Sequence, residues 1–192
     1  MTTRPRLAGR WLALLLLGVG LACASREQPT STPAENGPEA RFARAMSMHH
    51  EQAVEMALAI RDRSADSSIR RLALDIFLTQ QAQIGQMQGW LAAWQLSIGG
   101  SAPPMSGAHS PEHMGMATRA EVESLSSLPI RDAEEKFLEL MIRHHRGGMA
   151  MAEEALRETQ RPEVRRLATA IIESQQGEIQ YMEQLQAARH SH

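Results

Sequence analysis

An internal repeat with a constant offset of 95 residues (144 − 49 = 95) constrains the fold more than any other feature of this sequence. Each copy carries two adjacent histidines flanked by methionines: Met46, His49, His50 and Met56 in the first copy, and Met141, His144, His145 and Met151 in the second. The alignment continues without a gap into the next segment, where 70–73 and 165–168 both read Arg-Arg-Leu-Ala. A gap-free repeat of this length indicates a duplicated structural unit.

Apolar residues recur every three or four positions within each copy, which is the pattern of an amphipathic helix. The predicted helices cover 38–61, 69 to about 94, 132–159 and 162–189. Ser and Asp residues at 64–68 predict a short turn between the first two helices. Asp132 and Glu135 predict a capping box at the start of the third. Because the turns within each copy are short, each copy is expected to form an antiparallel hairpin.

The connection between the two copies is long and rich in Gly, Ser and Pro. Residues 97–117 show no apolar periodicity, so we expect a mobile crossover loop there, followed by a short helix after Thr118 and a turn at 127–129. The prediction is an all-α, ferritin-like four-helix bundle over 38–192. It consists of two duplicated hairpins (38–96 and 132–189) joined by the loop 97–131.

The N-terminal segment has the features of a secretory signal. Residues 1–23 combine three early arginines with an apolar run that is too short to span a membrane comfortably. The only cysteine, Cys23, follows Gly20-Leu21-Ala22 and resembles the cysteine of a bacterial lipobox, although Ala22-Cys23-Ala24 would also suit ordinary signal peptidase. We therefore expect export to the periplasm or cell envelope, lipidation of Cys23 as the only membrane attachment, and a flexible tether over 24–37.

The histidines and methionines of each copy share the inward face of one predicted helix. At about 100° per residue, the face is too wide for all of them to meet one ion. In the second copy, the helical geometry divides the candidate ligands into one group of His145, Met141 and Met149 and another of His144 and Met151. Buried structural histidines are the alternative interpretation, but repetition in both copies disfavours it, since unused buried imidazoles are costly.

The ligand types favour copper. Di-iron bundles use Glu-x-x-His, whereas Met46 precedes His49 and Met141 precedes His144 by three residues. Thioethers favour soft Cu(I), and imidazole also accepts Cu(II). The candidate metal ligands are His49, His50, His144, His145, Met46, Met141, Met56, Met149 and Met151. Further candidates for capture or transfer lie in the loop: Met105, His109, His113, Met114 and Met116. Residues expected to hydrogen-bond the histidines are Gln80, Gln83, Gln175 and Glu178.

These residues make the sequence resemble the bacterial family called domain of unknown function 305. The resemblance covers roughly 38–188 and rests on 137–145, on 149–152 and on the later Leu167, Ala168, Ile171, Gln175, Glu178, Ile179 and Met182. It implies a ferritin-like helical bundle, export to the envelope, and copper binding through His and Met. Arg143 departs from the family, which commonly has Pro before the histidine pair.

The sequence therefore predicts an exported protein that sequesters Cu(I) or hands it to another copper-handling envelope protein, in metal homeostasis or resistance. No catalytic residue is expected, and a homo-oligomer could complete a coordination sphere that one bundle leaves open. The net charge of −2 and a pI near 6.4 disfavour nucleic acid as a partner. Two alternatives stay open: a helical interaction or adaptor module without metal, and a ferritin-like dinuclear redox enzyme, which the missing Glu-x-x-His disfavours.

Overall fold

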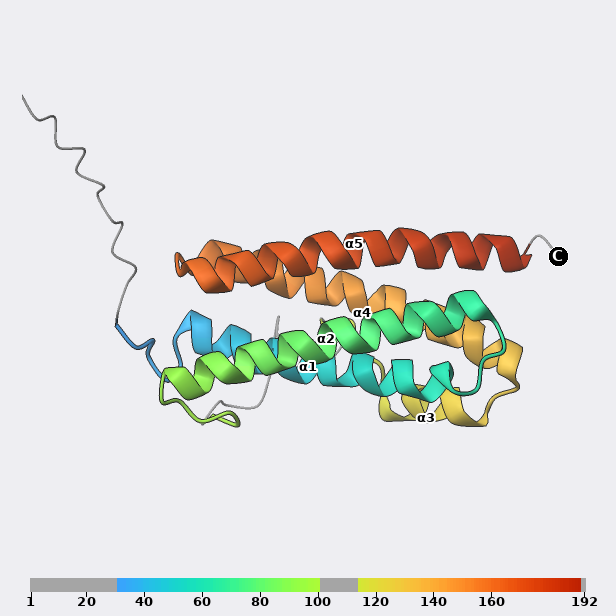
Figure 1. The fold of residues 1–192 in the computed structure, drawn as a ribbon, viewed down its shortest axis with the longest axis horizontal. Helices are drawn as coiled ribbons and strands as arrows, with labels where there is room; N and C mark the ends of the chain where they lie inside the picture. The colour runs from blue at the N-terminus through green and yellow to red at the C-terminus, as the bar shows by residue number, and fades with distance from the viewer. Residues whose placement is uncertain (1–30, 101–113, 191–192) are drawn as a thin grey trace, which may run out of the picture.

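The computed structural model describes residues 31–100 and 114–190, and within these ranges the chain forms five helices and no strand. In chain order they are α1 (Pro38–Arg61), α2 (Ser67–Ala93), α3 (Arg119–Ser127), α4 (Ile130–Glu158) and α5 (Pro162–His190) (Figure 1). The all-α prediction is confirmed. The expected signal segment, Cys23 and the loop candidates Met105, His109 and His113 lie outside the described residues. Among those described, no helix has the length and apolarity needed to span a bilayer.

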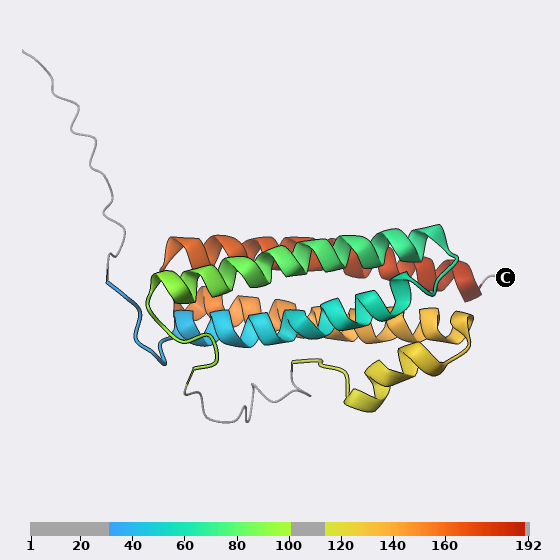
Figure 2. The same ribbon diagram turned by 60° about the horizontal axis from the view of Figure 1, so that its bottom comes forward.

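The helices form a bundle of two antiparallel hairpins. α1 pairs with α2, α4 pairs with α5, and α1 lies against α4 to join the hairpins. The short α3 packs outside the bundle across α1 and α4 (Figures 1 and 2). The predicted four-helix bundle with a long crossover is therefore confirmed, and so is the short helix after Thr118.

The helix starts differ in one respect from the prediction. The Asp66 carboxylate caps α2 by accepting hydrogen bonds from the backbone N–H of Ser68 (2.8 Å) and of Ile69 (3.4 Å). The capping box expected at Asp132 is wrong: α4 begins at Ile130, directly after Pro129, and no side chain of the described residues caps it. Pro129 cannot donate to a preceding helical turn and disfavours a helical Leu128, so α3 ends at Ser127 and α4 begins at Ile130.

A layer of polar side chains divides the bundle core into two hydrophobic clusters. We call it the polar layer; its members are His49, His50, Gln80, Gln83, His144, His145, Gln175 and Glu178. We call the cluster that begins at Ala53 on α1, after the polar layer, the first cluster. The cluster that ends at Met46 on α1, before the polar layer, is the second cluster. On α4 the order is reversed, since Met141 belongs to the first cluster and Met151 to the second. All four long helices pass from one cluster to the other at the polar layer.

The two hairpins are related by an internal two-fold axis. At the offset of 95 residues, members of one cluster map onto members of the other: Phe42, Met46 and Met87 of the second cluster onto Phe137, Met141 and Met182 of the first, and Met56, Ala57 and Leu72 of the first onto Met151, Ala152 and Leu167 of the second. This exchange is what a two-fold axis through the polar layer produces. The sequence repeat is therefore also a repeat in space.

Candidate metal centre

Four histidines occupy the middle of α1 and α4, and all four are fully buried. The rings of His49 and His144 stack face to face, with centroids 3.7 Å apart and planes inclined by 27°. His50 and His145 flank this pair, with ring centroids 6.2 Å from His49 and 6.3 Å from His144 respectively. Because 49 and 144 are equivalent positions, the stacked pair lies on the internal two-fold axis.

One hydrogen bond fixes the tautomer of His49. Its Nε2 lies 3.0 Å from the carbonyl oxygen of Met114, in the segment that precedes α3. A carbonyl oxygen can only accept, so Nε2 carries the proton and donates it. The lone pair of His49 is then on Nδ1, which is buried and has no hydrogen-bond partner in the described part of the chain.

The two flanking histidines are held from the outer helices. His50 Nε2 lies 2.7 Å from Gln83 Oε1 on α2, and His145 Nε2 lies 2.5 Å from Glu178 Oε2 on α5. Both acceptors place the proton on Nε2, which leaves the lone pair of each ring on Nδ1. Each of these Nδ1 atoms is buried and unpartnered within the described ranges. The predicted hydrogen bonds from Gln83 and Glu178 are thus present.

His144 differs from the other three, because neither ring nitrogen has a hydrogen-bond partner among the described residues. Burial lowers the pKa of His49 to about 4 and that of His50 to about 3, and it lowers the pKa of His144 well below 6.5. These three imidazoles are therefore neutral at pH 7. A neutral imidazole with a free lone pair is the form that binds a metal ion.

The expected hydrogen bonds from Gln80 and Gln175 to the histidines are wrong. Both amides are about 2 % exposed, yet none of their polar atoms has a partner in the described residues. Gln175 nevertheless lies within the layer: a Cβ built on Gly148 would be 2.6 Å from its Oε1 and 3.0 Å from His49 Cε1. Gly148 therefore makes room for these side chains. Buried polar atoms without partners are rare, and here they fit a site that receives an ion or water.

The methionines lie on both sides of the polar layer. Met46, Met56 and Met141 are fully buried, and Met151 is 8 % exposed. Met46 shares the second cluster with Met151, while Met56 shares the first with Met141. Each cluster thus contains one of these methionines from α1 and one from α4.

Met149 and Met151 of the second copy lie on different sides of the polar layer. Half-buried Met149 packs against the first cluster, which contains Met141, whereas Met151 lies in the second. Met149 also lines a surface pocket of about 260 Å³ between α4 and α5. Among the described residues, no three His, Cys, Asp or Glu side chains form a cluster suited to a metal ion. The individual ligand assignments stay predictions.

Sequence reasoning missed the packing of 114–117, which was expected to be part of a mobile loop. Met114 is 1 % exposed and belongs to the second core cluster, and Met116 packs against the same cluster. A Cβ on Gly147 would lie 1.8 Å from the Met114 carbonyl oxygen, so only glycine allows this crossing. Gly115 has φ +68°, and its own Cβ would be 2.3 Å from the Arg143 carbonyl oxygen. The signal was present as two adjacent glycines within a predicted helix.

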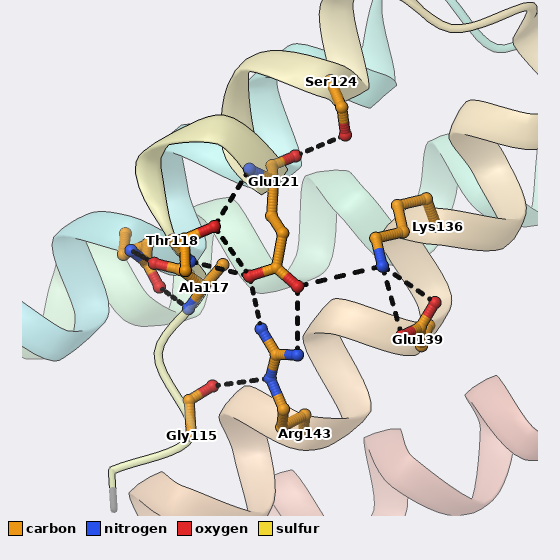
Figure 3. Close-up of polar contacts among 9 residues, drawn as sticks. Gly115, Ala117, Thr118, Glu121, Ser124, Lys136, Glu139 and Arg143 are labelled. Carbon is orange, nitrogen blue, oxygen red and sulfur yellow. Dashed lines mark hydrogen bonds and ion pairs between the residues drawn. The ribbon is translucent and has the colours of Figure 1, made fainter. Parts of the chain in front are cut away.

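Polar contacts fasten this segment beside the histidines. The Gln52 side chain donates to the Ala117 carbonyl (2.9 Å) and accepts from its N–H (2.7 Å). Arg143 binds the Glu121 carboxylate through two N–H groups, at 2.8 and 3.2 Å, and its Nε lies 3.4 Å from the Gly115 carbonyl oxygen (Figure 3). Arg143 thus ties α3 and the crossover segment to α4 next to His144.

Glu121→Gln should lower the free energy of unfolding by about 1 kcal/mol at pH 7, as expected for a partly exposed ion pair. The hydrogen bond from Arg143 is the main cause that lowers the pKa of Glu121 from 4.5 to about 2. Because the pKa is depressed in the folded state, the carboxylate stabilises fully above pH 4.5, and this contribution is lost as the pH falls toward 2. Denaturant unfolding at several pH values should show the difference from wild type vanish near pH 2. Glu123→Gln, at the exposed pair with Arg119, is the control.

Comparison with known proteins places this arrangement among related bundles. The family model described as "Domain of unknown function (DUF305)" matches residues 39–186. A DUF305 fragment from Deinococcus radiodurans is 42% identical, covering 81% of this chain and 99% of its own, with a TM-score of 0.72. A DUF305 protein from Streptomyces coelicolor, presumed to be secreted, is 45% identical, covering 81% and 96%, with a TM-score of 0.75.

A third similar structure is CopM in its Cu(I)-bound form. It is 27% identical and covers 77% of this chain and 94% of its own, with a TM-score of 0.62. CopM has also been solved in Cu(II)-bound and Ag-bound forms. None of the curated proteins compared with the chain matches it.

Proposed function

The chain belongs to the DUF305 family, and from the chemistry of its polar layer we propose that it is an exported copper-binding protein. The observation that carries the proposal is the set of four fully buried imidazoles, each with at least one unpartnered ring nitrogen within the described ranges. Thioethers on both sides of them add soft ligands. Imidazole with thioether is a donor set that favours Cu(I) and tolerates Cu(II). The Cu(I)-bound form of the similar protein CopM supports the same ion.

The role we propose is sequestration of Cu(I) or its transfer to another copper-handling protein of the envelope. The positions that hold glutamate in Glu-x-x-His bundles are Met46 and Met141, and their neutral thioethers do not suit dinuclear iron chemistry. We therefore propose binding without catalysis. Met114 is the candidate ligand best placed to couple the crossover to the site, because its backbone already holds His49.

Export and anchoring are part of the proposal. The apolar run within 1–23 and the presumed secretion of the Streptomyces coelicolor relative support export. Lipidation of Cys23 would attach the bundle to a membrane through the tether 24–37. Mass spectrometry of the membrane fraction from a bacterial host should find the Cys23 residue diacylated at its sulfur. A protein recovered only in soluble form with an unmodified N-terminus would contradict the anchor.

Anaerobic titration of the purified protein with Cu(I), against a chromophoric chelator, tests the proposed function. We expect the protein to withdraw Cu(I) from the chelator until it is saturated at a fixed number of ions per protein molecule. His190→Ala serves as the control, because this exposed histidine lies at the end of α5, away from the polar layer, and its loss should leave the affinity unchanged. If the protein withdraws no Cu(I), the proposal fails and a helical adaptor becomes the better interpretation.

A further inference from the structure

The two halves of the polar layer have the same geometry but a different charge. Gln83 on α2 and Glu178 on α5 occupy equivalent positions (178 − 83 = 95), and each holds the Nε2 of its histidine, at 2.7 and 2.5 Å. The other equivalent positions match in type, with two histidines and one glutamine in each half. The Glu178 carboxylate is therefore the one charge difference that the repeat introduces into the layer.

Within the described residues, Glu178 forms no ion pair with an Arg or Lys side chain. Its side chain is 20% exposed, and among the ion pairs of the described residues its partner is His145 alone. Arg146, which follows His145 on α4, is paired with Glu183 at 2.9 Å. The α4/α5 half thus holds a partly buried negative charge behind a ligand nitrogen, whereas the α1/α2 half holds a neutral amide.

Such a charge distinguishes ions by their valence. A fixed negative charge stabilises a divalent ion twice as strongly as a monovalent ion at the same distance, because the Coulomb energy is proportional to the charge of the ion. A carboxylate that accepts the imidazole N–H also makes the opposite nitrogen a stronger ligand. Met149, one turn after His145, has Val54 at the equivalent position. Its neutral thioether does not discriminate by charge, but it is a soft donor that favours Cu(I), so the carboxylate of Glu178 is the group in this half that favours a divalent ion.

We propose that Glu178 gives the His145 half of the layer a stronger preference for a divalent ion such as Cu(II) over a monovalent ion than the His50 half has. The inference rests on the proposed metal-binding function and adds a specificity to it. Glu178 is a positioning residue, because it acts on the ion through His145 and does not bind it. The two halves would then differ in their relative affinity for the two oxidation states of copper.

Glu178→Gln tests the inference by making the two halves chemically alike. Competition titrations of the full protein with Cu(II) and, separately, with Ag(I) as a redox-stable monovalent ion give the two affinities. We expect the Cu(II) affinity to fall by about 10–100-fold, the usual effect of losing such a partner. The Ag(I) affinity should fall only by the square root of that factor, roughly 3–10-fold. The ratio of the two affinities is a readout that a purely structural role of Glu178 would not change.

Gln83→Glu is the matched variant, because it adds the carboxylate to the other half. It should raise the Cu(II) affinity more than the Ag(I) affinity. Glutamate and glutamine side chains have nearly the same shape, so both variants should fold, and melting followed by circular dichroism checks this. Equal changes for the two ions, or no change in either variant, would overturn the inference while the copper site stands. If the wild-type protein binds neither ion, the proposed function itself fails.

Discussion

Replacing His49, His50, His144 and His145 together with leucine should lower the affinity for Cu(I) by at least about a thousandfold. Loss of a residue that only orients a ligand already costs about 10–100-fold, and this variant removes every imidazole of the polar layer. Leucine is chosen because it fills a volume close to that of the imidazole, so that no large cavity forms. Anaerobic chelator competition measures the change, and an unaltered affinity would show that the ligands lie elsewhere.

His144→Leu alone separates a ligand from a structural histidine. Its ring has no hydrogen bond to lose within the described residues, and burial depresses its pKa strongly. Removing an unpartnered buried polar group should therefore leave the metal-free protein at least as stable as wild type. The Cu(I) affinity should nevertheless fall by about tenfold or more. Urea unfolding of the metal-free variant checks the first expectation; a large loss of stability there would mean that the histidine stabilises the core.

Gly147→Ala should detach the crossover segment from α4. The added Cβ would lie 1.8 Å from the Met114 carbonyl oxygen and 2.9 Å from the Gly115 nitrogen, and both are backbone atoms that cannot turn aside. Detachment exposes the Met114 side chain, worth about 2 kcal/mol, and breaks the hydrogen bond to His49. The higher helix propensity of alanine than of glycine offsets about 1 kcal/mol of this loss. We therefore expect the free energy of unfolding to fall by about 1–3 kcal/mol. The Ala117 N–H, which donates to Gln52 Oε1 in the wild type, should exchange rapidly with solvent.

Gly177→Ala is the matched control, because a Cβ at this exposed position of α5 would meet nothing within 4 Å among the described residues. It should stabilise the protein by up to about 1 kcal/mol through helix propensity alone. Both variants are measured by urea unfolding and by hydrogen exchange. If Gly147→Ala were stabilised as much as the control, the close crossing at Met114 would be wrong.

The helices were predictable because their signals are local. Apolar spacing placed the long helices within a few residues of their bounds, and the gap-free repeat indicated two like hairpins. Four polar residues of the second helices were expected to hydrogen-bond the histidines; Gln83 and Glu178 do so, whereas Gln80 and Gln175 do not. The predicted cap at Asp132 failed because Pro129, three residues earlier, already sets the start of α4.

Contacts between segments far apart in the sequence could not be predicted in this way. Apolar periodicity says which face of α4 is buried, but it does not say that the backbone at Met114 crosses that face. Gly147 was a local indication of this crossing, because a glycine inside a helix lowers its stability by about 1 kcal/mol relative to alanine and so calls for a structural reason. Likewise, the stacking of His49 on His144 follows from the antiparallel packing of α1 and α4, and a helical wheel of either helix alone cannot reveal it.

The position of the two-fold axis has a consequence for assembly. Two separate hairpins could build the same layer only as a homodimer, and such a dimer would dissociate on dilution. Here the crossover joins them, so the second hairpin is always present at a high effective concentration. The stacked histidines therefore meet at any protein concentration. The proposed metal site therefore keeps both of its halves together even when few copies of the protein are present.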